Sequence, residues 1–210
     1  TISALDVVYP CSQDGTDYLV SKYPFSKGKI RTSYLGTMEY GVQQEFNRVD
    51  DIYHIATCSN LIPLKRVHLV AEALALLKRE GIANISWTCI GDGPEQEKIE
   101  AIIQEHDLSA QVNMLGRLPN KEVIEFYKTS YIDIFINIST SEGLPVSIME
   151  AQSFGMPVIA TDVGGTREIV NENTGWLIDS DVTAQYLTQS IKKVIELTPE
   201  EQKMMRENAR

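Results

Sequence analysis

Two glutamates with seven residues between them carry most of the chemical information in this sequence. Between Glu142 and Glu150 lie Gly143, which lets a backbone approach a ligand closely, and Pro145, which is pre-set for a first helical position. The N–H groups at such a helix start, with the helix dipole behind them, favour phosphate. Each carboxylate can accept a pair of hydroxyl hydrogen bonds. The segment therefore suits a polyhydroxylated, phosphorylated ligand.

The elements that must position these groups follow a strand–helix alternation. Short β-branched runs, apolar on both faces, alternate with amphipathic stretches, which predicts a parallel sheet covered by helices on both faces, a Rossmann-like α/β fold. Asn120 and Thr183 are expected to be helix N-caps. The predicted strands are residues 52–58, 85–90, 112–115, 132–138, 158–161 and 176–178. The predicted helices are residues 66–80, 94–106, 120–129, 145–154, 166–171 and 183–197.

The two ends of the chain fall outside this alternation. Near the N-terminus we expect strands at residues 6–10 and 29–35 on either side of a helix at residues 14–23. At the other end, residues 199–210 are expected to begin a further helix.

Bulk composition excludes several classes of function. The net charge is −10 and the pI is near 4.8, so no basic surface is available for nucleic acid. No apolar run approaches the length of a membrane span. Cys11, Cys58 and Cys89 lack CxxC spacing, and we interpret Cys58 and Cys89 as reduced core thiols. A cytoplasmic protein is expected, with peripheral contact at the inner face of a membrane left open.

The pattern around Glu142 and Glu150 resembles the Glu-x7-Glu motif of the family-four retaining glycosyltransferases, which use nucleotide-sugar donors and have the two-domain GT-B fold. Flanking elements agree in order and spacing. Residues 52–66 (IYHIATCSNLIPLKR) resemble the first strand and basic loop of the family's donor-binding domain. Residues 90–94 (IGDGP) resemble its second-strand loop, and residues 112–118 (VNMLGRL) its third strand.

The resemblance implies a division of the chain. Residues 46–197 would be the nucleotide-sugar donor-binding domain, one half of a GT-B fold. Residues 1–45 would be the C-terminal remnant of the acceptor-side domain with the start of a linker, the linker itself running over residues 41–51. Residues 198–210 would begin a helix that crosses back toward the first domain.

The same resemblance assigns roles to the two glutamates and their neighbours. Glu142 would hold hydroxyls of the transferred sugar, and Glu150 the ribose hydroxyls. Gly143 and Leu144 would offer backbone N–H groups to sugar or phosphate. The loop at Gly91 would line the nucleotide cleft.

The basic residues of the predicted cleft depart from the family at one position. Lys65 and Arg66 follow the first strand, and ligands of open α/β sheets bind outside the carboxyl ends of strands. The family places an Arg and a Lys five residues apart on the donor diphosphate; Lys65 matches the Lys, whereas Asn60 stands where the Arg is expected. Arg66 is a candidate replacement, and Arg117 a candidate for stacking on the nucleobase.

The predicted function is transfer of a sugar from a nucleotide-diphosphate donor to a carbohydrate or lipid-linked acceptor with retention of configuration. Glu142 and Lys65 would act at the reacting bond, with no metal and no cofactor beyond the donor. The nucleobase is not readable from the sequence. Two alternatives stay open: a non-catalytic nucleotide-sugar-binding or scaffolding module of the same fold, favoured by Asn60, and a GT-B epimerase or phosphorylase.

Overall fold

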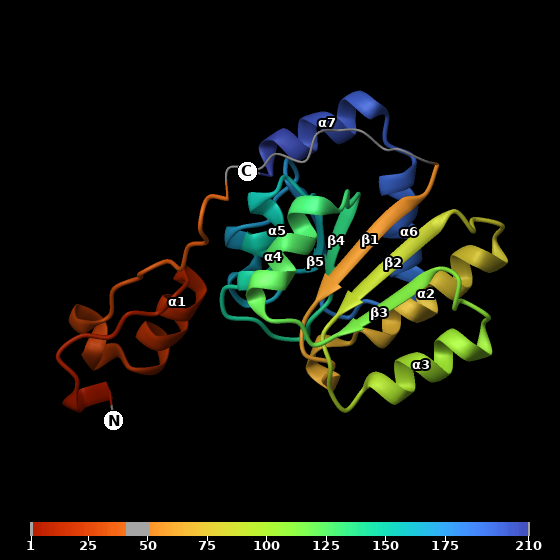
Figure 1. The fold of residues 1–210 in the computed structure, drawn as a ribbon. Coiled ribbons are helices and arrows are strands. Elements are labelled where there is room, and N and C mark those ends of the chain that lie inside the picture. The colour runs from red at the N-terminus through yellow and green to blue at the C-terminus, as the bar shows by residue number, and fades with distance from the viewer. Residues whose placement is uncertain (1, 41–50, 210) are drawn as a thin grey trace.

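A six-stranded parallel sheet forms the centre of the molecule (Figure 1). The computed structural model describes residues 2–40 and 51–209. The strand order is β3-β2-β1-β4-β5-β6, so the chain reverses direction across the sheet between β1 and β4. The strands are β1 Tyr53–Cys58, β2 Ile85–Ile90, β3 Val112–Gly116, β4 Ile134–Asn137, β5 Val158–Thr161 and β6 Gly175–Ile178.

Helices cover both faces of the sheet, as the alternation predicted. One hydrophobic core lies under α2, α3 and α6, and a second lies under α4 and α5. All four residues of β4 and of β5 are buried, as expected for central parallel strands between two helical layers. The helices are α2 His68–Arg79, α3 Gln96–Glu105, α4 Asn120–Thr129, α5 Val146–Ser153 and α6 Ala184–Ile195.

Two local predictions in this part of the chain were wrong. The segment predicted as a helix at residues 166–171 is a 3₁₀ helix, η4, at Gly164–Glu168, because two glycines fold against a neighbouring loop there. Asn120 is the first residue of α4 and not its N-cap, which is Pro119. Thr183 does cap α6, since its hydroxyl accepts a hydrogen bond from the backbone N–H of Tyr186.

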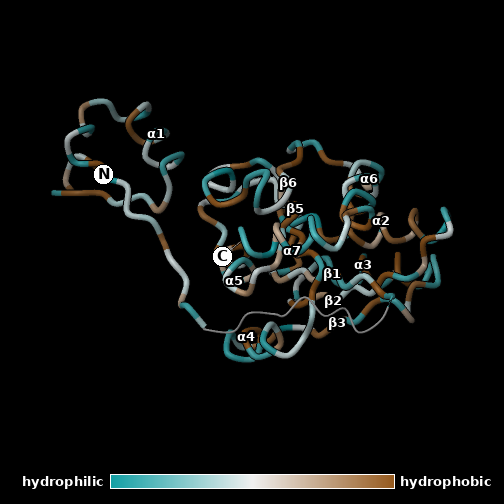
Figure 2. The backbone as a smooth tube through the Cα atoms, turned by 90° about the horizontal axis from the view of Figure 1, so that it is seen from above, coloured by the Kyte–Doolittle hydropathy of each residue, from teal (hydrophilic) through white to brown (hydrophobic). Residues whose placement is uncertain are grey.

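The N-terminal segment, residues 2–40, lies to one side of the part of the chain that contains the sheet (Figures 1 and 2). Its predicted helix is confirmed as α1 Gln13–Lys22, which η1 Ile2–Ala4 precedes and η2 Pro24–Lys29 follows. The two predicted strands were wrong: within the described residues this segment has only an isolated parallel bridge between Val8 and Ile30. A strand pair without further strands beside it is marginal, and Pro10 has no N–H to extend the ladder.

The C-terminal helix α7, Pro199–Asn208, packs back onto the sheet-containing part of the chain. Thr198 and Glu201 form a capping box at its start. Near its end the buried Arg206 donates a hydrogen bond to the carbonyl of Ile132 (2.6 Å) and stacks on the Tyr131 ring, 4.6 Å from its centroid. Most of the predicted linker, residues 41–50, lies outside the described residues. None of the helices that the structure describes is long and apolar enough to cross a bilayer.

Candidate functional site

The predicted catalytic pair lies at the point where the strand order reverses. Open α/β sheets bind ligands outside the carboxyl ends of the strands at this position. Lys65 ends η3, Pro63–Lys65, shortly after β1, and Glu142 follows β4. The two strands are direct neighbours, so the fold brings together two side chains that are 77 residues apart. The Lys65 Nζ lies 2.6 Å from the Glu142 Oε1.

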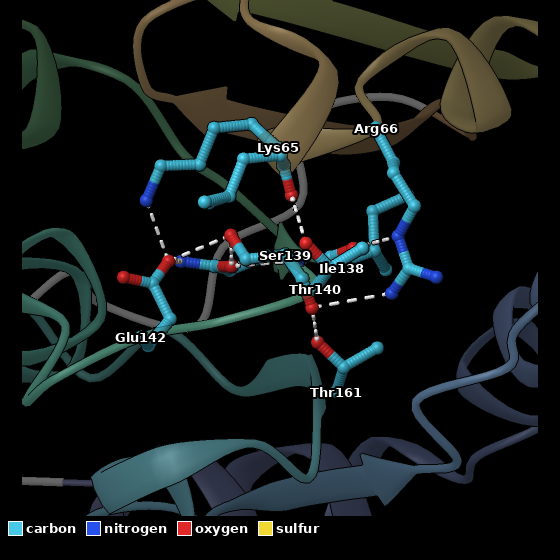
Figure 3. Close-up of polar contacts among 9 residues, drawn as sticks. Lys65, Arg66, Ile138, Ser139, Thr140, Glu142 and Thr161 are labelled. Atoms are coloured by element: carbon cyan, nitrogen blue, oxygen red, sulfur yellow. Dashed lines mark hydrogen bonds and ion pairs between the residues drawn. The ribbon is translucent and has the colours of Figure 1, made fainter.

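Three side chains donate to one oxygen of Glu142 (Figure 3). Besides Lys65, the Ser139 hydroxyl donates at 2.6 Å and the Asn137 Nδ2 at 3.1 Å, all to Oε1. Within the described part of the chain, no group donates to Oε2. The side chains of Lys65 and Glu142 are only 21% and 11% exposed. The carboxylate is therefore fixed on one side and open on the other.

Arg66, the candidate second cation for the diphosphate, is bonded to backbone carbonyls. Its backbone is left-handed (φ 51°), which turns the guanidinium away from Lys65 and onto three carbonyls: Ile138 at 2.8 Å, Ser139 at 3.1 Å and Ser180 at 2.6 Å. Burial lowers its pKa, and the Asp181 carboxylate opposes that shift. Arg66 thus ties the end of β4 to the loop after β6, with one hydrogen bond from each of its three nitrogens.

Glycines allow three loops to meet at the site. A Cβ on Gly164 would lie 1.9 Å from the Glu142 carbonyl oxygen, and one on Gly165 would lie 2.6 Å from that of Gly143. The Gly165 N–H donates to this Gly143 carbonyl at 2.8 Å. Gly91 (φ 137°) similarly allows the second-strand loop to touch the backbone of Ser59. The structure thus gives these glycines a packing function next to the site.

Two backbone N–H groups of interest lie in the turn that leads into α5. Pro145 is its N-cap, one position earlier than predicted, and has no side-chain group that could cap the first turn. Within the described residues, the N–H groups of Gly143 and Leu144 donate no hydrogen bond. These are the two N–H groups that the sequence predicts for phosphate or sugar, and they lie directly after Glu142.

The second glutamate has a partner that sequence reasoning missed. Glu150 lies in α5, and its Oε1 accepts a hydrogen bond of 2.7 Å from the Asn120 side chain at the start of α4. The loop before Asn120 contains Arg117, whose side chain is exposed. The stacking role of Arg117 stays a prediction. Asn120 links the loop predicted to border the base to the carboxylate predicted to bind the ribose.

A carboxylate also links this region to the N-terminal segment. Glu168, at the end of η4, accepts hydrogen bonds from the backbone N–H groups of Gln13 (2.7 Å) and Asp14 (2.9 Å), the first two residues of α1. Anionic side chains at a helix N-terminus stabilise the helix through its dipole and its unpaired N–H groups. At the opposite end of η4, Gly165 holds the loop that carries Glu142.

Comparison with known proteins identifies the family of this chain. The family model described as "Glycosyl transferases group 1" matches residues 42–210, which is most of the chain. The chain belongs to this family of glycosyltransferases. The group 1 domain contains Lys65, Glu142 and Glu150, together with the six strands that position them.

The curated relatives of this group 1 chain have different names. A phosphatidylinositol N-acetylglucosaminyltransferase subunit from Arabidopsis thaliana is 30% identical over 149 residues, covering 71% of this chain and 32% of the relative. WcaL of Escherichia coli, a putative colanic acid biosynthesis glycosyltransferase, is 30% identical over 154 residues, covering 70% and 37%. The chain thus spans about a third of the length of these relatives.

Solved structures confirm the fold as one half of a GT-B glycosyltransferase. The pneumococcal O-GlcNAc transferase GtfA, solved in complex with UDP and GlcNAc, has a TM-score of 0.79 and is 22% identical, covering 98% of this chain and 41% of that one. Anabaena Alr3699/HepE, in complex with UDP and glucose, also has a TM-score of 0.79 at 21% identity, covering 97% and 57%.

The Asn120–Glu150 contact of this group 1 chain leads to a first prediction. Asn120→Ala is expected to weaken nucleotide binding about three- to tenfold, since a single hydrogen bond that orients a carboxylate is lost. Calorimetric titration with nucleotide checks it. Asn113→Ala, at an exposed position of β3, is the matched control and should bind as the wild type does. Equal affinities for the wild type and both variants would show that the Asn120–Glu150 hydrogen bond does not contribute to nucleotide binding.

Proposed function

We propose that this chain is the donor-binding half of a retaining glycosyltransferase that transfers a sugar from a UDP-sugar to a carbohydrate or lipid-linked acceptor. The observation that carries the proposal is the Lys65–Glu142 pair at the reversal point of the sheet, with Oε2 of Glu142 open beside the start of α5. UDP is proposed because similar solved structures contain it. The cytoplasm is the proposed location, in agreement with the free thiols of Cys58 and Cys89, whose burial raises the pKa of each to about 11.

Lys65 and the backbone would act on the leaving group. The bond that breaks joins the anomeric carbon to the diphosphate, so negative charge builds on the phosphate oxygens. The Lys65 ammonium has three protons, of which Glu142 takes one, and the remaining two are available to the diphosphate. The N–H groups of Gly143 and Leu144 would add neutral donors in the turn before α5. Donors fixed before the reaction stabilise developing charge without reorganisation.

The two glutamates would orient the donor. Glu142 would hold hydroxyls of the transferred sugar, and Glu150, held by Asn120, the ribose hydroxyls. Fixing the anomeric carbon relative to the acceptor reduces the entropic part of the barrier. In the retaining mechanism that the family suggests, the acceptor attacks from the face the diphosphate leaves, and the leaving phosphate takes the acceptor's proton.

One observation favours a second candidate function, a binding module that does not transfer sugar. Asn60 replaces the expected Arg, and Arg66, the candidate replacement, is engaged on carbonyls. Of Asn60, Lys65 and Arg66, only Lys65 would then place a positive charge against the diphosphate. Such a protein would bind a nucleotide sugar without transferring it.

Calorimetric titration of the full-length protein with UDP, GDP and ADP tests the proposal. We expect UDP to bind, and Lys65→Ala to weaken it about 10–100-fold, because a charged donor to the diphosphate is lost. Lys193→Ala, an exposed lysine at the end of α6, is the control and should leave UDP binding unchanged.

The same protein, incubated with a UDP-sugar and candidate acceptors, separates the alternatives. Sugar transfer supports the glycosyltransferase, donor binding without transfer supports the binding module, and an epimerised or phosphorolysed product supports an epimerase or phosphorylase. Absence of nucleotide binding by the full-length protein would contradict the proposed donor site.

A further inference from the structure

Asn137 and Ser139 lie behind Glu142, on the side away from its open oxygen. Asn137 is the last residue of β4 and is 8% exposed, and Ser139 is fully buried. Both side chains donate to Oε1 of Glu142, and Figure 3 shows Ser139 beside the carboxylate. Both side chains are thus buried against the carboxylate that they contact.

The protons of this cluster can be assigned from its distances. The Ser139 hydroxyl has one proton and two acceptors within reach, Oδ1 of Asn137 at 2.7 Å and Oε1 of Glu142 at 2.6 Å. The Ser139 backbone N–H already donates to that Asn137 oxygen at 3.2 Å. Since a hydrogen bond to a charged acceptor is the stronger one, the hydroxyl proton belongs to Glu142.

The same set of hydrogen bonds determines the orientation of the Asn137 amide. Its Oδ1 accepts the Ser139 N–H, so its NH₂ group faces Oε1 of Glu142. A flipped amide would set two oxygens against each other at the carboxylate and leave the Ser139 N–H facing a donor. The arrangement that keeps the Ser139 N–H bond therefore has Lys65, Asn137 and Ser139 all donating to Oε1.

We propose that Asn137 and Ser139 are positioning residues that direct Oε2 of Glu142 at the hydroxyls of the donor sugar. With Oε1 occupied by three donors, Oε2 is the oxygen left to accept from a ligand. This role rests on the proposed function. The role concerns only one part of the donor. The two residues act through Glu142 on the sugar and do not affect binding of the nucleotide.

The test compares two ligands on the full-length protein. Dissociation constants are measured for UDP and for a sugar nucleotide, UDP-glucose or UDP-N-acetylglucosamine, whichever the wild type binds. Ser139→Ala and Asn137→Leu are each expected to raise the Kd of the sugar nucleotide about tenfold and to change that of UDP less than about twofold. Ser190→Ala, which removes a buried hydroxyl from α6, is the matched control and should alter neither constant.

A second arm tests whether the residues act through Glu142. In a Glu142→Gln background, Ser139→Ala should cause little further loss, because effects that pass through one group are not additive. Equal losses for UDP and the sugar nucleotide, unchanged affinities, or full additivity with Glu142→Gln would each overturn the role. If the wild type binds UDP and the variants give one of these results, only this inference is overturned. A wild type that binds neither ligand overturns the proposed function as well.

Discussion

In the full-length protein, Glu142→Gln is expected to lower kcat/KM for the proposed sugar transfer about 10²–10³-fold while the protein remains folded. The amide has nearly the volume of the carboxylate, and its oxygen can still accept from Lys65 and Ser139. The group facing the sugar becomes an NH₂, however, which cannot accept hydroxyl hydrogen bonds, and hydrogen bonds to a charged group contribute about 1.5–3 kcal/mol each. Steady-state kinetics with saturating acceptor measure the loss.

The control for this variant is Glu97→Gln, an exposed carboxylate in the first turn of α3, which should transfer sugar at the wild-type rate. Thermal unfolding should show both variants folded at the assay temperature. A Glu142→Gln protein that retained full kcat/KM would remove Glu142 from the reaction and leave it a structural partner of Lys65.

Gly164→Ala is expected to destabilise the protein by about 2–4 kcal/mol and to abolish most transfer. Its backbone is left-handed (φ 53°), and the added Cβ would lie 1.9 Å from the carbonyl oxygen of Glu142, a contact that must be relieved by moving one of the two loops. Left-handed strain costs about 1–2 kcal/mol, and overpacking costs about 1–3 kcal/mol. Chemical denaturation gives the free energy of unfolding, and the kinetics above give the activity.

Gly28→Ala provides the comparison for Gly164→Ala. Gly28 has no atom within 4 Å of its would-be Cβ and an ordinary φ, so its substitution should leave both stability and activity close to wild type. Wild-type stability for Gly164→Ala would mean that the loop of Glu142 yields easily, contrary to the fixed geometry described above.

The sheet could be predicted because the residue types of its strands reflect their burial. β4 and β5 are buried on both faces, and a run of apolar β-branched residues is what such burial requires. The meeting of Lys65 and Glu142 could be predicted for a related reason. Both follow strands, and the carboxyl ends of parallel strands share one edge of the sheet.

The partners of these residues could not be predicted, because they depend on contacts between distant segments. Arg66 looked like a free cation beside Lys65, yet its left-handed backbone and the carbonyl of Ser180, 114 residues away, determine its direction. Asn120 matched a capping pattern, but Glu150 competes for its side chain. The signal available for Ser139 and Asn137 was their closeness in sequence to Glu142.

The 3₁₀ helix η4 is bonded at both of its ends, which makes its length as important as its composition. Gly165 holds the loop of Glu142, and Glu168 holds the start of α1. Each residue of a 3₁₀ helix advances about 2.0 Å and turns about a third of a circle. One inserted or deleted residue would therefore rotate the Glu168 carboxylate off α1. Surface connections usually accept such changes, but the spacing between the two anchors of this segment, Gly165 and Glu168, is fixed.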